Sequence, residues 1–274
     1  MKYINNLFSV SYISLGMLIV LTIIIHMIDT LAYSVRLNAV KSGQFALSFS
    51  LFNIIVLVSR TANMLQGPLI GSMIDKSILN GTDPISDIRN VIFAATIGTI
   101  FGIILIPTFI NIFSKAVLKL GSTGSMPTIV LQSLSVDNIK RIAKNVSRPS
   151  KQMLRGLRYR DIPKRLMFFS ILITGVYTIG VLAANYSAIF VSPEHRLTAV
   201  GSSGIINGLA SILLTLIVDP KAAIITDEVY RGKRKYGDIK ALVIMLIASK
   251  LLGTLLGQLL IVPGAKLISI IYNT

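Results

Sequence analysis

Polar and titratable side chains interrupt the first long apolar segment of this sequence, at positions that would lie inside a membrane. His26, Asp29, Tyr33 and Arg36 share one face of a helix, because each lies within about 80° of His26 at about 100° per residue. A charge at the centre of a bilayer costs about 2.5–3.5 kcal/mol, so this stripe must face a cavity or other helices. Either His26 and Asp29 satisfy each other or cap neighbouring helices, or they relay a proton or hold a cation. We expect a coupling or gating role for His26, Asp29 and Tyr33.

The second and sixth apolar segments add cations and amides at membrane depth. Asn53 and Arg60 are seven residues apart and nearly superpose on a helix, with Asn63 within about 80° of Arg60. Arg stays charged in proteins, so Arg60 must pair with a carboxylate such as Asp29, bind a phosphate through its planar fork, or snorkel to the outer interface. Lys250 either bonds backbone carbonyls at a helix crossing or lines a pathway. The predicted substrate-binding residues are Arg36, Asn53, Arg60, Asn63 and Lys250.

The sequence lacks the side chains of most enzyme and cofactor sites. It contains no Cys, and His26 and His195 are its two histidines. No cluster of His or acidic residues has the spacing of a metal site, and no Gly-Lys-Ser or Gly-Lys-Thr loop could cradle nucleotide phosphates. We therefore expect no catalytic residues, no metal and no cofactor, and a chain that does not hydrolyse ATP itself.

The elements that position these residues follow from composition. Of 274 residues, 53% are apolar and 14% are charged, against roughly 25% charged in soluble domains, and the mean hydropathy is +0.74. These values exclude a soluble enzyme and predict an all-α integral membrane protein, with residues 1–274 as a single polytopic domain. The six expected spans, each near the ~20 residues that a bilayer requires, are 13–34, 45–66, 89–112, 166–190, 199–218 and 241–262.

The distribution of positive charge predicts the orientation of these spans. The net charge is +16, and 20 of the 27 Lys and Arg residues fall in the loops 35–44, 113–165 and 219–240, against five on the other side. Basic loops stay in the cytoplasm, so both termini should be extracytoplasmic, and no nucleic-acid partner is needed to explain the charge. Within 115–165, twelve basic residues alternate with apolar ones, as in amphipathic helices that bind anionic inner-leaflet lipids. Orientation alone would also account for this loop.

The two halves of the chain share landmarks. A Gly-Thr-x-x-Gly sequence at 98–102 precedes Pro107 in the third span, and the same pattern at 253–257 precedes Pro263 in the sixth. Each half holds three spans, so a second copy would be inverted relative to the first, as in alternating-access transporters. The pattern therefore favours two inverted three-helix repeats, although small residues at helix crossings would produce similar matches by chance.

Two sequence blocks resemble the Amj family of bacterial lipid II flippases. They are Ile-His-Met-Ile-Asp-Thr-Leu-Ala-Tyr-Ser-Val-Arg at 25–36 and Ser-Leu-Phe-Asn-Ile-Ile-Val-Leu-Val-Ser-Arg-Thr-Ala-Asn-Met-Leu-Gln-Gly-Pro at 50–68, and the detailed likeness covers about residues 23–76. The resemblance implies a multi-pass protein of the bacterial cell membrane. Its partner would be lipid II, an undecaprenyl-pyrophosphate-linked peptidoglycan precursor that such a protein moves from the inner to the outer leaflet for cell-wall synthesis.

Two other functions fit the same residues. A proton-coupled secondary transporter of a soluble anionic substrate would also need buried cations, and a lateral opening towards lipid would separate a flippase from it. A membrane scaffold would use the basic loop 113–165 to recruit an anionic partner, and the buried charges would then be dispensable. The sequence predicts no particular oligomeric state.

Overall fold

The structure is a computed structural model that describes residues 2–123, 147, 153 and 155–272. Six helical segments in these ranges are long and apolar enough to cross a membrane, which confirms the predicted all-α fold with six spans. The helices are α1 (Lys2–Ser42), α2 (Phe45–Asn80), α3 (Ile85–Thr123), α6 (Lys164–Ser187), α7 (Arg196–Gly201), α8 (Ser203–Leu213), α9 (Asp219–Tyr230) and α10 (Tyr236–Tyr272). Short 3₁₀ turns lie at Tyr159–Asp161 and Pro193–His195.

The fifth span extends over Pro193–Tyr230, beyond the expected 199–218, and it is not one regular α-helix. It is divided into α7, α8 and α9, with a π-helical turn at Leu214–Val218 between α8 and α9. The turn directly precedes Pro220 at the start of α9. Proline has no N–H to donate, and its ring clashes with the carbonyl four residues earlier, so the widened turn accommodates it. Turns of this kind often occur at functional sites.

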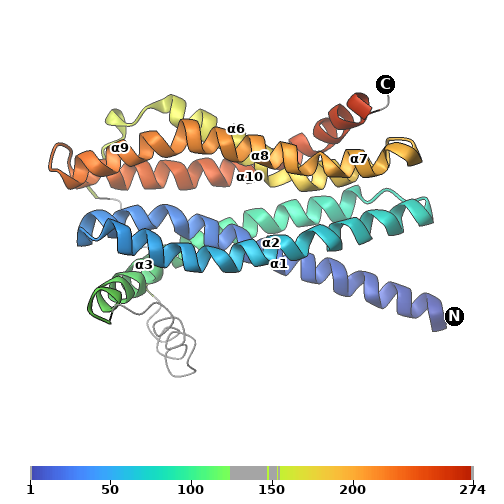
Figure 1. Cartoon of the computed structure of the whole chain (residues 1–274), viewed down its shortest axis with the longest axis horizontal. Helices are drawn as coiled ribbons and strands as arrows, with labels where there is room; N and C mark the ends of the chain where they lie inside the picture. Colours follow the sequence, from blue (N-terminus) through green and yellow to red (C-terminus); the bar gives the residue numbers. More distant parts are fainter. Residues whose placement is uncertain (1, 124–146, 148–152, 154, 273–274) are drawn as a thin grey trace.

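The helices form two groups, α1–α3 and α6–α10, which lie as separate layers in Figure 1. In the first group α1 packs against α2 and α3, and in the second group α6 packs against α8 and α10. A Cβ atom on Gly102 of α3 would lie 2.6 Å from Thr30 Cβ on α1, and one on Gly253 of α10 would lie 2.6 Å from Thr174 Cβ on α6. Glycine is required at both crossings because any side chain would push the helices apart.

Apolar side chains close one end of the molecule more tightly than the other. At one end a single cluster joins both groups, with Ile88 and Ile92 of α3 against Ile179 of α6 and Ile261 of α10. At the opposite end, the fully buried residues belong to two clusters, one within Ile162 and α6–α10 and one within α1–α3, and partly buried residues such as Tyr33, Leu37 and Ile103 pack against the first of them. The two groups therefore share a fully buried cluster at one end, here called the sealed end, whereas at the other, here called the separable end, partly buried side chains make the apolar contacts between them.

The basic loop joins the two groups, and most of its predicted amphipathic helices fall outside the described residues. The described part near α6 is held against the α9–α10 turn. Arg158 forms ion pairs with Asp161 and with the buried Asp238 of α10, at 3.0 and 3.3 Å. The end of the loop is thus fixed at the separable end of the molecule.

Candidate functional site

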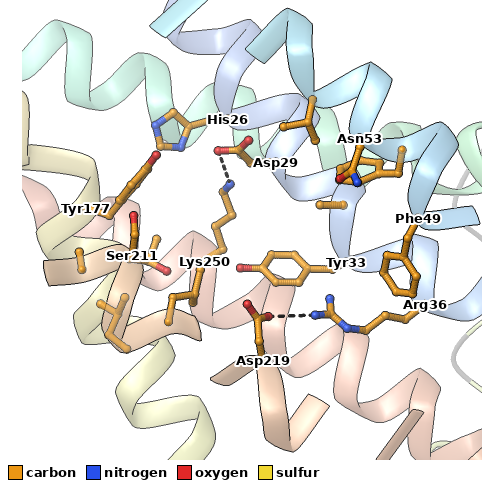
Figure 2. A pocket seen from close by; sticks show the side chains of 17 residues that line it. His26, Asp29, Tyr33, Arg36, Phe49, Asn53, Tyr177, Ser211, Asp219 and Lys250 are labelled. Carbon is orange, nitrogen blue, oxygen red and sulfur yellow. Dashed lines mark hydrogen bonds and ion pairs between the residues drawn. The ribbon is translucent and has the colours of Figure 1, made fainter. Parts of the chain in front are cut away.

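A cavity of about 390 Å³ lies between the two helix groups (Figure 2). Helices α1, α2, α6, α8 and α10, together with the π turn and the start of α9, contribute its walls. The polar stripe of α1 that the sequence indicated forms one wall. The stripe is therefore directed into a cavity between helices and not towards lipid.

Asp29 of α1 and Lys250 of α10 form an ion pair across this cavity. Lys250 Nζ lies 3.5 Å from an Asp29 carboxylate oxygen, and the exposed fractions of the two side chains are 7% and 30%. Ser59 of α2 donates a hydrogen bond of 3.1 Å to the same carboxylate. Asp29 thereby links α1 to α2 through Ser59 and to α10 through Lys250. Its carboxylate also neutralises the buried Lys250 ammonium.

Arg36 and Asp219 form a second ion pair between the two groups. The Arg36 guanidinium lies 3.0 Å from the carboxylate of Asp219, the first residue of α9 after the π turn. Arg36 follows Asp29 by seven residues and lies on the same face of α1. In one pair α1 supplies the acid and in the other it supplies the base, so both pairs connect α1 to α6–α10.

Three further ring side chains lie along the same cavity. Tyr33 lies between the two ion pairs, and the Tyr177 hydroxyl of α6 points towards the His26 imidazole (Figure 2). His26 is 8% exposed, and its Nδ1 atom has no hydrogen-bond partner among the described residues. This places an unsatisfied titratable group about one helical turn from Asp29.

The structure brings six of the eight predicted site residues into this cavity: His26, Asp29, Tyr33, Arg36, Asn53 and Lys250. Asn63 instead lines a smaller neighbouring cavity, in which His26 also takes part. The expected pairing of Asp29 with Arg60 is wrong, because Asp29 pairs with Lys250. Ser59 occupies the buried face of α2 towards α1, and Arg60, one residue further round the helix, is exposed.

Sequence reasoning missed several residues that line the cavity. Tyr177, Ser211 and Asp219 line the cavity but were not among the predicted site residues. One signal in the sequence could have identified Asp219. Arg36 needs an acidic partner, and few acidic residues occur near the ends of the predicted spans. Within the described residues, no group of three or more His, Asp or Glu side chains could hold a metal ion.

Two residues that line the cavity are also exposed at the surface. They are Asn53 of α2 and Ser211 of α8, which lie on opposite sides of the cavity in Figure 2. An adjoining pocket of about 470 Å³ shares Arg36, Phe49 and Asp219 with it and continues to Tyr230 near the α9–α10 turn.

Comparison with known proteins shows which family the sequence is similar to. A model of the family Amj, described as "Alternate to MurJ", matches residues 21–272. A protein named lipid II flippase Amj, from Bacillus subtilis (strain 168), is 42% identical over 249 residues, which cover 90% of this chain and 92% of that protein. No solved structure matches the chain.

Proposed function

The chain belongs to the Amj family, and we propose that it is a lipid II flippase that carries this lipid from the inner to the outer leaflet. It is a multi-pass membrane protein with six spanning segments. The relative from Bacillus subtilis bears the name lipid II flippase and aligns along nearly its whole length. The chemistry of the cavity supports the same substrate for this chain.

The observation that carries the proposal is the pair of ionic bridges across the cavity. Lys250 and Arg36 are cations in a site within the membrane, and each is neutralised by a carboxylate of the other helix group. A pyrophosphate offers the same kind of oxygens with more negative charge, and guanidinium binds it through two parallel hydrogen bonds. The headgroup of a polyprenyl-pyrophosphate lipid can therefore replace Asp29 at Lys250 and Asp219 at Arg36.

This exchange supplies a mechanism for alternating access. Both bridges run from α1 to the second helix group. Their replacement by one bound headgroup therefore removes two direct ionic links between the groups. The displaced Asp29 carboxylate then lies beside the anionic headgroup, and repulsion between the two negative charges favours its taking a proton. His26, three residues earlier on α1, is the group placed to give that proton, and Tyr33 separates the two bridges.

The orientation of the cycle follows from the positive charge of the loops. We propose that the separable end faces the cytoplasm, because the basic loops 35–44 and 219–240 lie there, and that both termini are extracytoplasmic. The described state is then inward-facing. The basic loop 113–165 would gather anionic lipids at the inner leaflet near the cavity entrance.

The exposure of cavity-lining residues on α2 and α8 favours a lipid over a soluble anion, because a lipid headgroup would enter past them from the side of the helix bundle. Asn53 and Arg60 lie on one exposed stripe of α2, and Asn53 also lines the cavity, as does the exposed Ser211 of α8. We assign to Arg60 the first contact with the headgroup as it leaves the leaflet. Asn63, on the same helix, lines the inner chamber that adjoins His26.

We further propose that the two helix groups are inverted repeats. The support is that α3 crosses α1 at Gly98 and Gly102 in the way that α10 crosses α6 at Gly253 and Gly257. Contacts between the groups also have matching partners, α1 with α9 and α2 with α6. A transport path between two such repeats is typical of secondary carriers.

The test is transport by the purified chain in liposomes. Fluorescent lipid II should become accessible in the opposite leaflet, whereas an anionic phospholipid of ordinary chain length should not. The matched competitor is the water-soluble headgroup without its polyprenyl tail. Uptake of that soluble anion without movement of lipid II would contradict the flippase and favour the soluble-anion transporter.

A further inference from the structure

A second, smaller polar chamber adjoins the main cavity on the side of the sealed end. It has a volume of about 40 Å³, and His26 lines both it and the main cavity. We propose that this chamber holds ordered water and forms the outer half of a proton pathway that ends on His26. The inference rests on the proposed transport function and adds to it an entry route and a positioning residue, Asn207.

The polar atoms of the chamber lack the partners that a dry site would require. Among the described residues, His26 Nδ1 and Asn207 Oδ1 are both buried without a hydrogen-bond partner. Leaving such a group unsatisfied costs about 1–3 kcal/mol. A cavity of this size exceeds the ~10–15 Å³ that one water needs, and Asn63 and Tyr177 supply further polar groups. Water that bridges His26 and Asn207 satisfies both atoms.

Asn207 is placed in the chamber by the backbone opposite it. A Cβ atom on Gly180 of α6 would collide with the Asn207 amide, so the glycine provides the room that this amide occupies. Thr178, which lines the same chamber, uses its hydroxyl within its own helix, at 2.7 Å from the Thr174 carbonyl. Asn207 is therefore available to water, whereas the Thr178 hydroxyl is already engaged.

The location of the chamber indicates that it acts in the outward-facing state, the opposite of the state described. Ile70, Ile92 and Leu182 line it and also belong to the apolar cluster that seals that end. When the two helix groups separate there, the chamber opens to the outer side while the main cavity closes. His26 then faces the cytoplasmic cavity in one state and the outer solution in the other.

The charged and titratable groups around His26 define the proton transfers. Asp29 faces it from α1, Lys250 from α10 and Tyr177 from α6, with Arg60 of α2 further out, and α3 contributes apolar residues. In the outward state Nδ1 accepts a proton that the chamber water relays from the outer solution, which gives an imidazolium. When the headgroup displaces Asp29 from Lys250, the proton on Nε2 passes to the carboxylate and His26 returns to the neutral form. Asp29 releases this proton to the cytoplasmic cavity when it pairs with Lys250 again, and exchange with water moves the remaining imidazole proton from Nδ1 back to Nε2.

Nitrogen NMR on the full chain tests the water site without using transport. The sequence has two histidines, so the variant His195→Gln leaves His26 as the single labelled imidazole. In lipid discs, at a pH at which His26 is partly protonated, the Nδ1 proton of His26 should exchange with water. Asn207→Leu and Gly180→Ala should reduce that exchange by about tenfold or more, and Thr178→Val should leave it unchanged. Absence of exchange in the parent protein, or equal exchange in all three variants, would overturn the proposal.

Proton flux into liposomes tests the pathway and separates it from the flippase proposal. Addition of lipid II should change the luminal pH in the parent protein, and His26→Gln and Asn207→Leu should abolish or strongly slow that change. Lipid II movement with no proton flux would overturn the proton pathway and leave the flippase intact. Proton flux that depends on Asn207 but occurs without lipid II movement would support the chamber and contradict the proposed substrate.

Discussion

Asp29 of α1 and Lys250 of α10 form a 3.5 Å ion pair that joins the two helix groups across the cavity. The two residues belong to different halves of the chain, because α1 lies in the first helix group and α10 in the second. The distance between the two side chains therefore depends on how the two helix groups are positioned relative to each other. It also makes the stability of the protein depend on the same residues that we assign to transport.

The two partners of this pair should differ in their effect on stability. Lys250 is almost completely buried and Asp29 is partly exposed, so Asp29→Asn leaves a buried ammonium without a partner. We expect a loss of about 3 kcal/mol for Asp29→Asn and a smaller loss for Lys250→Met. The double variant should recover most of the stability but no transport. Thermal unfolding in detergent measures this, and equal losses for the two single variants would contradict the assigned burial.

Arg36 should act through the geometry of its guanidinium as well as its charge. Arg36→Lys keeps the charge but loses the planar fork, so transport of a pyrophosphate lipid should fall, and Arg36→Ala should reduce it further. Asp219→Asn removes the competitor for Arg36 and should tighten binding of the headgroup. Lipid II binding to the purified variants provides the measurement. Full binding by Arg36→Ala would remove Arg36 from the site.

Arg60 should influence capture of the substrate more than its movement. It is exposed on α2, outside the main cavity. Arg60→Ala should lower the transport rate at low lipid II density in the membrane and leave the rate at high density close to that of the parent, whereas Arg60→Lys should have a weaker effect. A reduction that is the same at every density would show that Arg60 acts elsewhere in the cycle.

The orientation can be tested with single cysteines in this Cys-free chain. Thr82 in the α2–α3 turn and Lys233 in the α9–α10 turn are both exposed and lie at opposite ends of the molecule. An impermeant reagent should label Thr82→Cys in intact cells and Lys233→Cys only after permeabilisation. The reverse pattern would make the described state outward-facing and the proposed direction of opening wrong.

The crossings at glycine should be equally sensitive in both halves. Gly102→Ala and Gly253→Ala each introduce a Cβ atom about 2.6 Å from a threonine of the partner helix. Both should lower the unfolding temperature, while Gly71→Ala, with open space around it, should have little effect. A large difference between the first two would weaken the proposed repeat.

The sequence predicted the polar stripe of α1 because helical periodicity alone places His26, Asp29 and Arg36 on one face. It did not predict their partners, since pairing across the cavity depends on how α1 packs against α9 and α10. Arg60 illustrates the limit. Its type and depth suited Asp29, but the buried face of α2 next to α1 is occupied by Ser59.

The break in the fifth span was signalled less clearly. Pro220 follows Asp219 near the predicted span end, which is also the normal position of a proline that begins a helix. The helical run continues to Tyr230, and the π turn before Asp219 brings that carboxylate into the cavity beside Arg36. Tertiary packing decided between these two outcomes.

The central claim is that an anionic lipid headgroup binds Lys250 in exchange for Asp29. The most direct measurement is the rate of lipid II translocation in liposomes that contain the parent chain, Lys250→Ala or Lys266→Ala. Lys266 lies on the same helix as Lys250 but is exposed, so it controls for the loss of one positive charge. The account predicts that Lys250→Ala abolishes translocation in protein that remains folded, while Lys266→Ala retains the parent rate. Translocation at the parent rate by Lys250→Ala would contradict it.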